Sequence, residues 1–191
     1  MRYLLCAIHY LPMNDHELIE KFAVAESRNY AFNLLVRKYQ QKIYWHIRKM
    51  VIDHDDADDL VQETFIKAWQ ALDNFRGDAQ LYTWLYRIAT NECLNFLNKK
   101  KKRFFLPIGD IAHELADKLD NDPLVTGDEI QLRLQKALLT LPDKQRLVFN
   151  MKYFDDMKYD DIAKITGTSV GALKASYHIA VKKIEDFLTE H

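Results

Sequence analysis

The sequence contains few of the residues that interrupt helices or cross-link chains. Among 191 residues there are five glycines, four prolines and two cysteines. Scarcity of glycine and proline implies few turns and favours long helices, and no segment carries the pattern of a strand. Cys6 and Cys93 cannot build the disulfide framework of a small secreted domain, so the chain suits a reducing cytoplasm. These absences predict an all-α protein located in the cytoplasm.

Other absences narrow the classes of function. The seven histidines are scattered singly, without the paired spacing of a zinc site, so no metal is expected. No nucleophile motif, phosphate-binding loop or pocket of paired carboxylates can be found, which argues against an enzyme, a cofactor and a small-molecule substrate. The apolar start of the chain is too short to span a membrane and lacks a small-residue cleavage site, so residues 1–13 are interpreted as an N-terminal extension.

Charge is nearly balanced over the whole chain but is segregated along it. The formal net charge is −1, which alone would argue against a nucleic-acid partner. From Arg76 to Arg103, however, the sequence contains seven cations and two anions, which gives a local charge of +5. From Phe104 to Glu129, one cation accompanies seven anions, a local charge of −6. Such segregation can give a basic binding face on a neutral protein.

Apolar residues recur at helical spacing in eight segments, which divide into two groups. Residues 14–103 are expected to form a four-helix bundle, and residues 129–191 a second helical domain. Residues 104–128 hold two prolines, two glycines and six acidic residues against a single lysine, and are interpreted as an irregular acidic linker. The helices are expected at Glu17–Ala25, Asn29–Met50, the segment from the acidic cluster Asp53–Asp59 to Leu72, Gln80–Lys102, Glu129–Thr140, Asp143–Tyr153, Tyr159–Ile165 and Ser169–Leu188.

The stretch from Ala71 to Arg103 combines a loop with one glycine, a helix rich in aromatics and five consecutive cations, Lys99 to Arg103. Aromatic side chains can stack on or wedge between bases, and lysines can neutralise phosphates. One helix carrying both is suited to unstacked, single-stranded DNA. Two plainer interpretations stay open: aromatics at helical spacing, including Trp84, also fill cores, and cations suit the end of any helix.

The segment from Tyr159 to Ile184 has the spacing of a helix-turn-helix. Gly167 permits a left-handed turn, and Ser169 is a good N-cap for the second helix. The outward side of that helix, where a recognition helix meets the major groove, would carry Gly171, Lys174, Ala175 and His178. Lys182 would add positive charge for contact with phosphates. A plain helical hairpin packed in a core is the alternative. The absence of arginine after Gly167 rules out a forked arginine reading guanine from this helix.

Three motifs in order resemble a known family. The segments DADDLVQETFIKAWQAL, FRGDAQLYTWLYRIATN and LPDKQRLVFNMKYFDDMKYDDIAKITGTSVGALKASYHIAVKKI, with an acidic linker before the third, resemble a bacterial RNA polymerase sigma factor of the extracytoplasmic-function group. The resemblance covers residues 29–188. Departures from the family pattern bear on the promoter sequence: Asn95 and Asn98 stand where Asp and Arg are common, and Ser176 and Ile179 where Arg is frequent.

The resemblance implies three sets of site residues. The implied partner is core RNA polymerase, with its largest and second-largest subunits. Its largest subunit would be bound, at the clamp helices, by Asp58, Asp59, Gln62 and Glu63, although an acidic helix face can also be merely solvated. The minus-ten promoter element would be bound by Phe75, Arg76, Trp84, Tyr86, Arg87, Asn91, Asn95, Lys99, Lys100 and Lys101. The minus-thirty-five element would be bound by Ser169, Gly171, Lys174, Ala175, His178 and Lys182.

The function implied by the resemblance is that of a specificity subunit that directs promoter recognition, DNA melting and transcription initiation, for a stress, cell-envelope or transport regulon. The family also implies an anti-sigma factor as a partner, often a membrane protein, which would hold the chain at the inner membrane. The alternative function is a stand-alone helix-turn-helix regulator that binds duplex DNA by itself. That alternative leaves the aromatic helix and the acidic helix without a role.

Overall fold

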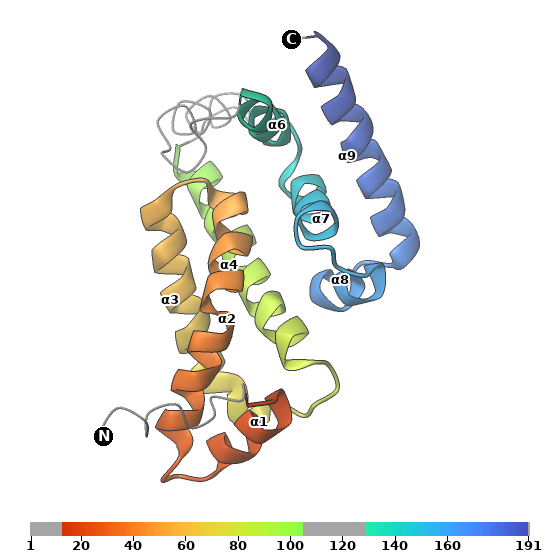
Figure 1. Ribbon diagram of the computed structural model, residues 1–191. Helices are drawn as coiled ribbons and strands as arrows, with labels where there is room; N and C mark the ends of the chain where they lie inside the picture. Colours follow the sequence, from red (N-terminus) through yellow and green to blue (C-terminus); the bar gives the residue numbers. More distant parts are fainter. Residues whose placement is uncertain (1–12, 105–128, 191) are drawn as a thin grey trace, which may run out of the picture.

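The computed structural model describes residues 13–104 and 129–190, and over these ranges it is helical, without strands (Figure 1). Residues 1–12 of the expected extension 1–13, and residues 105–128 of the expected acidic linker 104–128, lie outside the described residues. The elements are α1 Asp15–Ala23, α2 Arg28–Val51, α3 His54–Ala71, a short 3-10 turn Leu72–Asn74, α4 Leu81–Phe104, α6 Glu129–Leu139, α7 Asp143–Tyr153, α8 Tyr159–Thr166 and α9 Val170–Glu190.

The first group of helices packs around α2, which contacts α1, α3 and α4. One face of α2 is apolar at intervals of three and four residues, the spacing that places side chains on one side of a helix. Leu35, Ile43 and Ile47 on this face are almost fully buried. Opposite them, α4 contributes Leu81 and Leu85, which are equally buried. This apolar layer fixes which faces of α3 and α4 are left to solvent.

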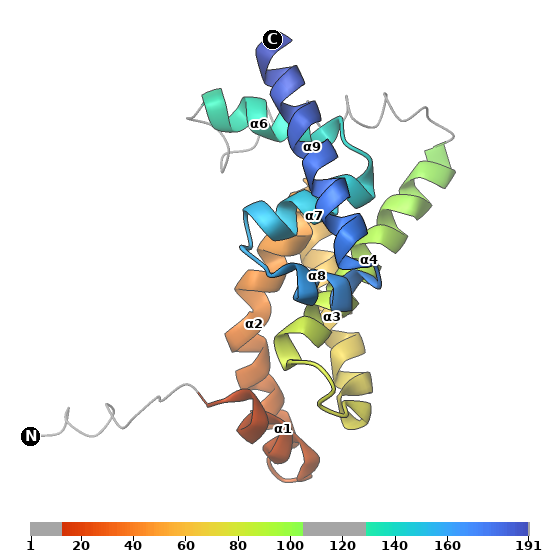
Figure 2. The same cartoon turned by 90° about the vertical axis from the view of Figure 1, so that its right-hand side faces the viewer.

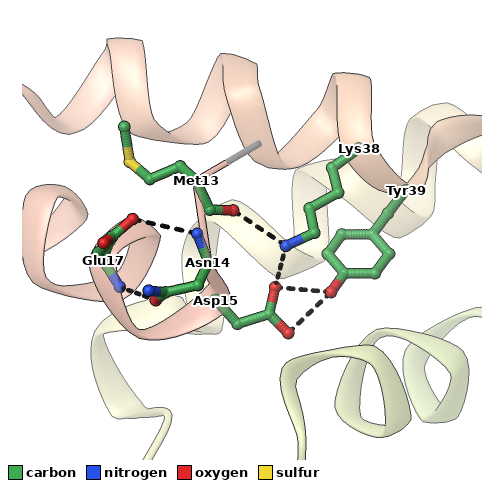
Figure 3. Close-up of polar contacts among 6 residues, drawn as sticks. All are labelled: Met13, Asn14, Asp15, Glu17, Lys38 and Tyr39. Atoms are coloured by element: carbon green, nitrogen blue, oxygen red, sulfur yellow. Dashed lines mark hydrogen bonds and ion pairs between the residues drawn. The ribbon is translucent and has the colours of Figure 1, made fainter. Parts of the chain in front are cut away.

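Polar contacts at the first turn of α1 connect this helix to α2 (Figure 3). The side chain of Asn14 accepts a hydrogen bond from the backbone of Glu17, and Glu17 accepts one from the backbone of Asn14, which forms a capping box. Asp15 then accepts hydrogen bonds from Lys38 at 2.8 Å and from the hydroxyl of Tyr39 at 2.7 Å. Burial and the bond to Asp15 raise the pKa of Tyr39, so this hydroxyl remains a donor.

Replacing Asn14 with alanine is expected to lower the free energy of unfolding by about 1 kcal/mol, because the cap at the start of α1 loses its side-chain acceptor. Urea denaturation of the two proteins measures this difference. The exposed His16 lies on the same helix but does not cap it, so His16→Ala should change the value by less than about 0.5 kcal/mol. Equal losses in both variants would contradict the role assigned to Asn14.

The second group consists of α6 to α9. In Figure 1, α9 lies on the side of this group that is away from α2 and α3, and Figure 2 shows the molecule from that side, with α9 in front. Helix α8 ends at Gly167, which adopts φ 68° and ψ 18°, a left-handed conformation that favours glycine over other residues. The chain therefore reverses sharply before α9 begins. Leu173 is buried on the side of α9 that faces α8, as expected for a helix-turn-helix.

The two groups of helices pack against each other through α2 with α7 and α4 with α8. We call this contact the junction. One continuous cluster of buried apolar residues crosses it, from Leu18 in α1 to Leu173 in α9. Polar contacts accompany the cluster: the guanidinium of Arg146 donates to the carbonyl of Met50 at 3.0 Å, and Lys49 forms an ion pair with Asp155. The junction is therefore both apolar and charged.

Asp155 contributes to the junction in a pH-dependent way. Its burial alone would raise the pKa of the carboxyl, but the neighbouring His46 and Lys49 outweigh burial and lower it below the ordinary 3.8. One Asp155 oxygen lies 3.5 Å from His46 Nδ1, which is longer than most hydrogen bonds. A lowered pKa means that the ionised carboxylate stabilises the folded chain at pH values above 3.8, and that this contribution is lost as the pH falls below it.

We expect the free energy of unfolding to fall as the pH drops below 3.8, and to fall less steeply in an Asp155→Asn variant. Urea titrations at a series of pH values measure the two slopes. The neighbouring Asp156 has a side chain that is 97% exposed, so Asp156→Asn should keep the wild-type slope. If Asp155→Asn also keeps it, the carboxylate does not stabilise the junction.

Candidate nucleic-acid and protein interfaces

The acidic candidate surface lies on the outer side of α3. The side chain of Asp53 caps this helix by accepting a hydrogen bond from the Asp56 backbone at 3.0 Å. The inward side of α3 is occupied by buried residues such as Leu60 and Ala68, which leaves the opposite side to solvent. All four residues predicted to bind polymerase are exposed there: Asp58, Asp59, Gln62 and Glu63.

This surface also includes an apolar residue that the sequence interpretation did not single out. Ile66 is 52% exposed, and it follows Gln62 by four residues on the same side of α3. The four-residue spacing from Gln62 is the sequence signal that could have placed Ile66 on this surface. We call Asp58, Asp59, Gln62, Glu63 and Ile66 the α3 face. Acidic side chains around one exposed apolar residue are suited to a basic protein surface with an apolar pocket.

The first candidate DNA surface begins in the turn before α4. Gly77 adopts φ 76°, which lets the chain turn back, and Arg76 beside it is exposed. The rings of Phe75 and Trp84 pack together with centroids 5.3 Å apart, and both are half-buried. Trp84 is therefore neither a fully buried core residue nor a free wedge. Its ring lies at the edge of the bundle, supported by Phe75.

Further along α4, four predicted contact residues recur every four positions. Arg87, Asn91, Asn95 and Lys99 are all exposed, and their spacing places them on one side of the helix. We call these four residues the α4 row. The two asparagines of the row can donate and accept hydrogen bonds to bases, and the cations at its two ends, Arg87 and Lys99, can contact phosphates.

Two predicted lysines are engaged in ion pairs. Lys100 lies 3.4 Å from the carboxylate of Asp56 in α3, and Lys101 pairs with Asp143 in α7. Neither lysine points to open solvent as the α4 row does, since both are only partly exposed. In this conformation they connect helices, and their contact with a DNA backbone would require these pairs to be exchanged for phosphates.

Tyr86 is the predicted DNA-contact residue whose position differs most from the expectation. It is only 3% exposed, because the side of α4 that carries it packs against α2 and the second group of helices. Its ring lies 4.7 Å from His46 and 4.5 Å from Tyr82 between centroids, and its hydroxyl donates to the carbonyl of Lys42 at 3.4 Å. Burial raises the pKa of Tyr86. The ring is therefore not available to bases in this conformation.

The second candidate DNA surface is α9. The hydroxyl of Ser169 accepts a hydrogen bond from the backbone of Ala172 at 3.3 Å, which caps the helix as expected. Lys174 extends over the ring of Tyr159, 5.8 Å from its centroid. The predicted contact residues are exposed: Ser169, Gly171, Lys174, Ala175, His178 and Lys182.

Within residues 13–104 and 129–190, the structure brings together no three or more His, Cys, Asp or Glu side chains that could hold a metal ion. No helix in those ranges has the length and apolar character needed to cross a bilayer. Cys93 is buried, and burial raises the pKa of its thiol to about 12, so it carries no thiolate at neutral pH.

Two family models match the chain, and one solved structure is similar to it. The family model for Sigma-70 region 2 matches residues 35–103, which include the α3 face and the α4 row. The family model for Sigma-70, region 4 matches residues 131–184, which include the helix-turn-helix. Among solved structures, that of CnrH in complex with the cytosolic domain of CnrY is similar, with a TM-score of 0.66, 26% identity and coverage of 92% of this chain and 99% of the other.

Curated relatives extend the similarity over almost the whole chain. The RNA polymerase sigma-H factor of Pseudomonas aeruginosa is 35% identical over 184 residues, covering 91% of this chain and 93% of the relative. The ECF RNA polymerase sigma-E factor of Escherichia coli is 32% identical over 184 residues, with 91% and 94% covered. The chain therefore belongs to the sigma-70 family, as a sigma factor of the extracytoplasmic-function group that directs transcription initiation.

Proposed function

We propose that the chain is a dissociable specificity subunit that attaches core RNA polymerase to a promoter through three separate surfaces and catalyses no reaction itself. The α3 face binds the polymerase, the α4 row with Phe75, Arg76 and Trp84 binds the minus-ten element, and α9 binds the minus-thirty-five element. The observation that supports this proposal best is the α4 row, which continues along α4 beyond the Phe75–Trp84 pair.

At the minus-ten element, the proposed role is to hold bases that have left the double helix. Unpairing and unstacking a base costs a few kcal/mol, which stacking on a supported aromatic ring and hydrogen bonds to the base can offset. The ring of Trp84 offers the stacking surface, while Asn91 and Asn95 offer donors and acceptors. Because these contacts exist only with opened DNA, they shift the population from the closed to the melted promoter.

At the minus-thirty-five element, α9 would enter the major groove of duplex DNA, as the second helix of a helix-turn-helix does. Lys174 and Lys182 would neutralise phosphates, and the binding should therefore weaken as salt rises. The Sigma-70, region 4 match over residues 131–184 supports this assignment.

The proposal extends to regulation and location. The structural neighbour CnrH was solved with the cytosolic domain of CnrY, and another neighbour at 23% identity is a sigma factor with the anti-sigma factor NepR. These complexes support an anti-sigma partner for this chain, whether soluble or membrane-bound. The proposed site of action is the cytoplasm, with a stress, cell-envelope or transport regulon as the set of target genes.

Run-off transcription with purified core polymerase on genomic fragments tests the function. We expect specific initiation with the chain and none without it. An Arg87→Ala, Asn91→Ala double variant should bind core polymerase normally but open promoters poorly, because both side chains are exposed and belong to the α4 row. A stand-alone regulator would instead bind a duplex tightly without polymerase, and its DNA binding would be indifferent to these two changes.

A further inference from the structure

The exposed side of α9 carries two parallel rows of side chains. Lys174, His178 and Lys182 recur every four residues and form a basic row. Beside it, Ala172, Ala175 and Ile179 recur at intervals of three and four residues, and all three are exposed. Residues spaced in this way lie on one side of a helix. We call the second set the apolar row.

The apolar row is not needed for the core. The inward side of α9 already buries Leu173, Ala180 and Ile184, whereas Ile179 is 45% exposed. A single exposed apolar residue is ordinary on a protein surface. The alignment of Ile179 with two exposed alanines, on the candidate recognition helix and directly beside the basic row, is a more specific arrangement.

The chemistry of the major groove indicates what such a row can recognise. Thymine presents a C5-methyl group there, and alanine or larger apolar side chains make contact with it. Guanine is usually read by the fork of an arginine, and residues 168–191 contain no arginine. Flanking lysines provide the phosphate contacts that bring a helix into the groove. An anionic partner with apolar groups between its charges fits both rows.

We propose that Ala175 and Ile179 recognise thymine methyl groups in the duplex of the minus-thirty-five element, with Lys174 and Lys182 on the adjacent phosphates. This inference rests on the proposed function and specifies what that surface reads. Four residues of helix rise about 6 Å, and stacked base pairs are about 3.4 Å apart. The two thymines should therefore lie within about two base pairs of each other.

The experiment uses the full chain with core polymerase. Upstream duplexes are first selected from a promoter fragment randomised around the minus-thirty-five position. Each thymine in the selected sequence is then replaced with deoxyuridine, which removes only the methyl group and keeps the hydrogen-bonding pattern. Loss of one buried methyl contact should weaken binding about fourfold at one or two positions, with little effect at the others.

Variants assign the effect to a side chain. Ile179→Ser should bind the thymine duplex more weakly and should lose the response to deoxyuridine at one position. Ile179→Val keeps an apolar group and should keep that response. Ile130→Ser, which alters the same residue type at a 77% exposed position in α6, should behave like the unmodified chain. Because Ile179 and Ile130 are both exposed, circular dichroism should show the same helical content in all three variants.

Three results would overturn the inference. Selected duplexes could lack thymine, or deoxyuridine could leave the binding of the unmodified chain unchanged at every position. Ile179→Ser could also leave DNA binding intact while abolishing association with a protein partner, which would make the apolar row a protein interface. A separate experiment tests the proposed role of α9 itself, by transcription from fragments in which the upstream duplex is deleted. If initiation does not depend on that duplex, the proposed function of α9 is refuted, and not only the recognition of thymine.

Discussion

Replacing Asp59 and Glu63 with lysine is expected to reduce the affinity of the chain for core RNA polymerase by at least about 100-fold. Both carboxylates are exposed on the α3 face, and they would meet a basic surface on the polymerase. Reversing their charges turns attraction into repulsion, and juxtaposed like charges at an interface cost several kcal/mol. A 100-fold loss corresponds to only about 2.7 kcal/mol, so the expectation is conservative. Competition for fluorescent core polymerase measures the affinity.

The matched control reverses two acidic residues elsewhere in the same group of helices. Glu20 and Glu26 are exposed near α1, outside the α3 face, and their replacement with lysine gives the same change in net charge. This control should retain affinity to within about threefold. Both double variants should also unfold at nearly wild-type urea concentrations, since surface changes usually alter stability by less than about 0.5 kcal/mol each. Similar binding by both double variants would contradict the role of the α3 face.

Replacing Arg146 with alanine is expected to lower the free energy of unfolding by about 3 kcal/mol, the lower end of the range for breaking a buried charged contact. Arg146 is 3% exposed, and its guanidinium donates to the carbonyl of Met50 in the last turn of α2. The final carbonyls of a helix have no partners within it, and a cation there is favourable. The variant would leave that carbonyl buried without this donor. Urea denaturation measures the loss.

Arg133 provides the control for this variant. Its guanidinium donates to the carbonyl of Leu188 near the end of α9, at 2.9 Å, so the chemistry is the same. The contact lies within the second group of helices and is only partly buried, so Arg133→Ala should cost about 1 kcal/mol. Small-angle scattering separates the two: Arg146→Ala should enlarge the radius of gyration, because the junction opens, and Arg133→Ala should not. No enlargement in either variant would contradict the importance of Arg146 for the junction.

The helices were largely predictable because their signals are local. Apolar periodicity predicted a helix over Asp143–Tyr153, which is also the observed extent of α7. The left-handed turn was predictable from Gly167, and the cap of α9 from Ser169. Local signals do not choose between Asn14 and Asp15 as the cap of α1, since either residue type can cap a helix, and the structure assigns the cap to Asn14. The predicted all-α fold is confirmed.

The exposure of the candidate site residues was predictable where a side chain lies on a solvated helix face. The family resemblance identified the residues of the α4 row and four of the five residues of the α3 face, and helical spacing predicted that the members of each set share one side of a helix. The burial of Tyr86 was not predictable in this way, because it depends on α2 and the second group of helices, which are distant in sequence. The ion pair between Lys49 and Asp155 likewise joins residues 106 positions apart. Periodicity describes one helix at a time and contains no information on which charged residues meet across two groups of helices.

The junction has a consequence for the order of events at a promoter. By their names, the two promoter elements lie about 25 base pairs apart, or about 85 Å of straight duplex. In the packed conformation, α8 contacts both α4 and α9 and is about 12 Å long. With helix axes 8–10 Å apart on either side, α9 begins within about 30 Å of α4. The packed chain therefore cannot reach both elements at once.

Parting the two groups of helices would expose the apolar residues that they share, such as Met151 and Ile162, to water. Such exposure costs free energy in proportion to the apolar area uncovered. Without polymerase, the two groups of helices should therefore stay packed together, and the chain should have a low affinity for free promoters in the cell. We therefore expect the favourable contacts with core polymerase to supply the free energy that separates the two groups of helices, so that the chain spans a promoter only when it is bound to the enzyme that will transcribe the gene.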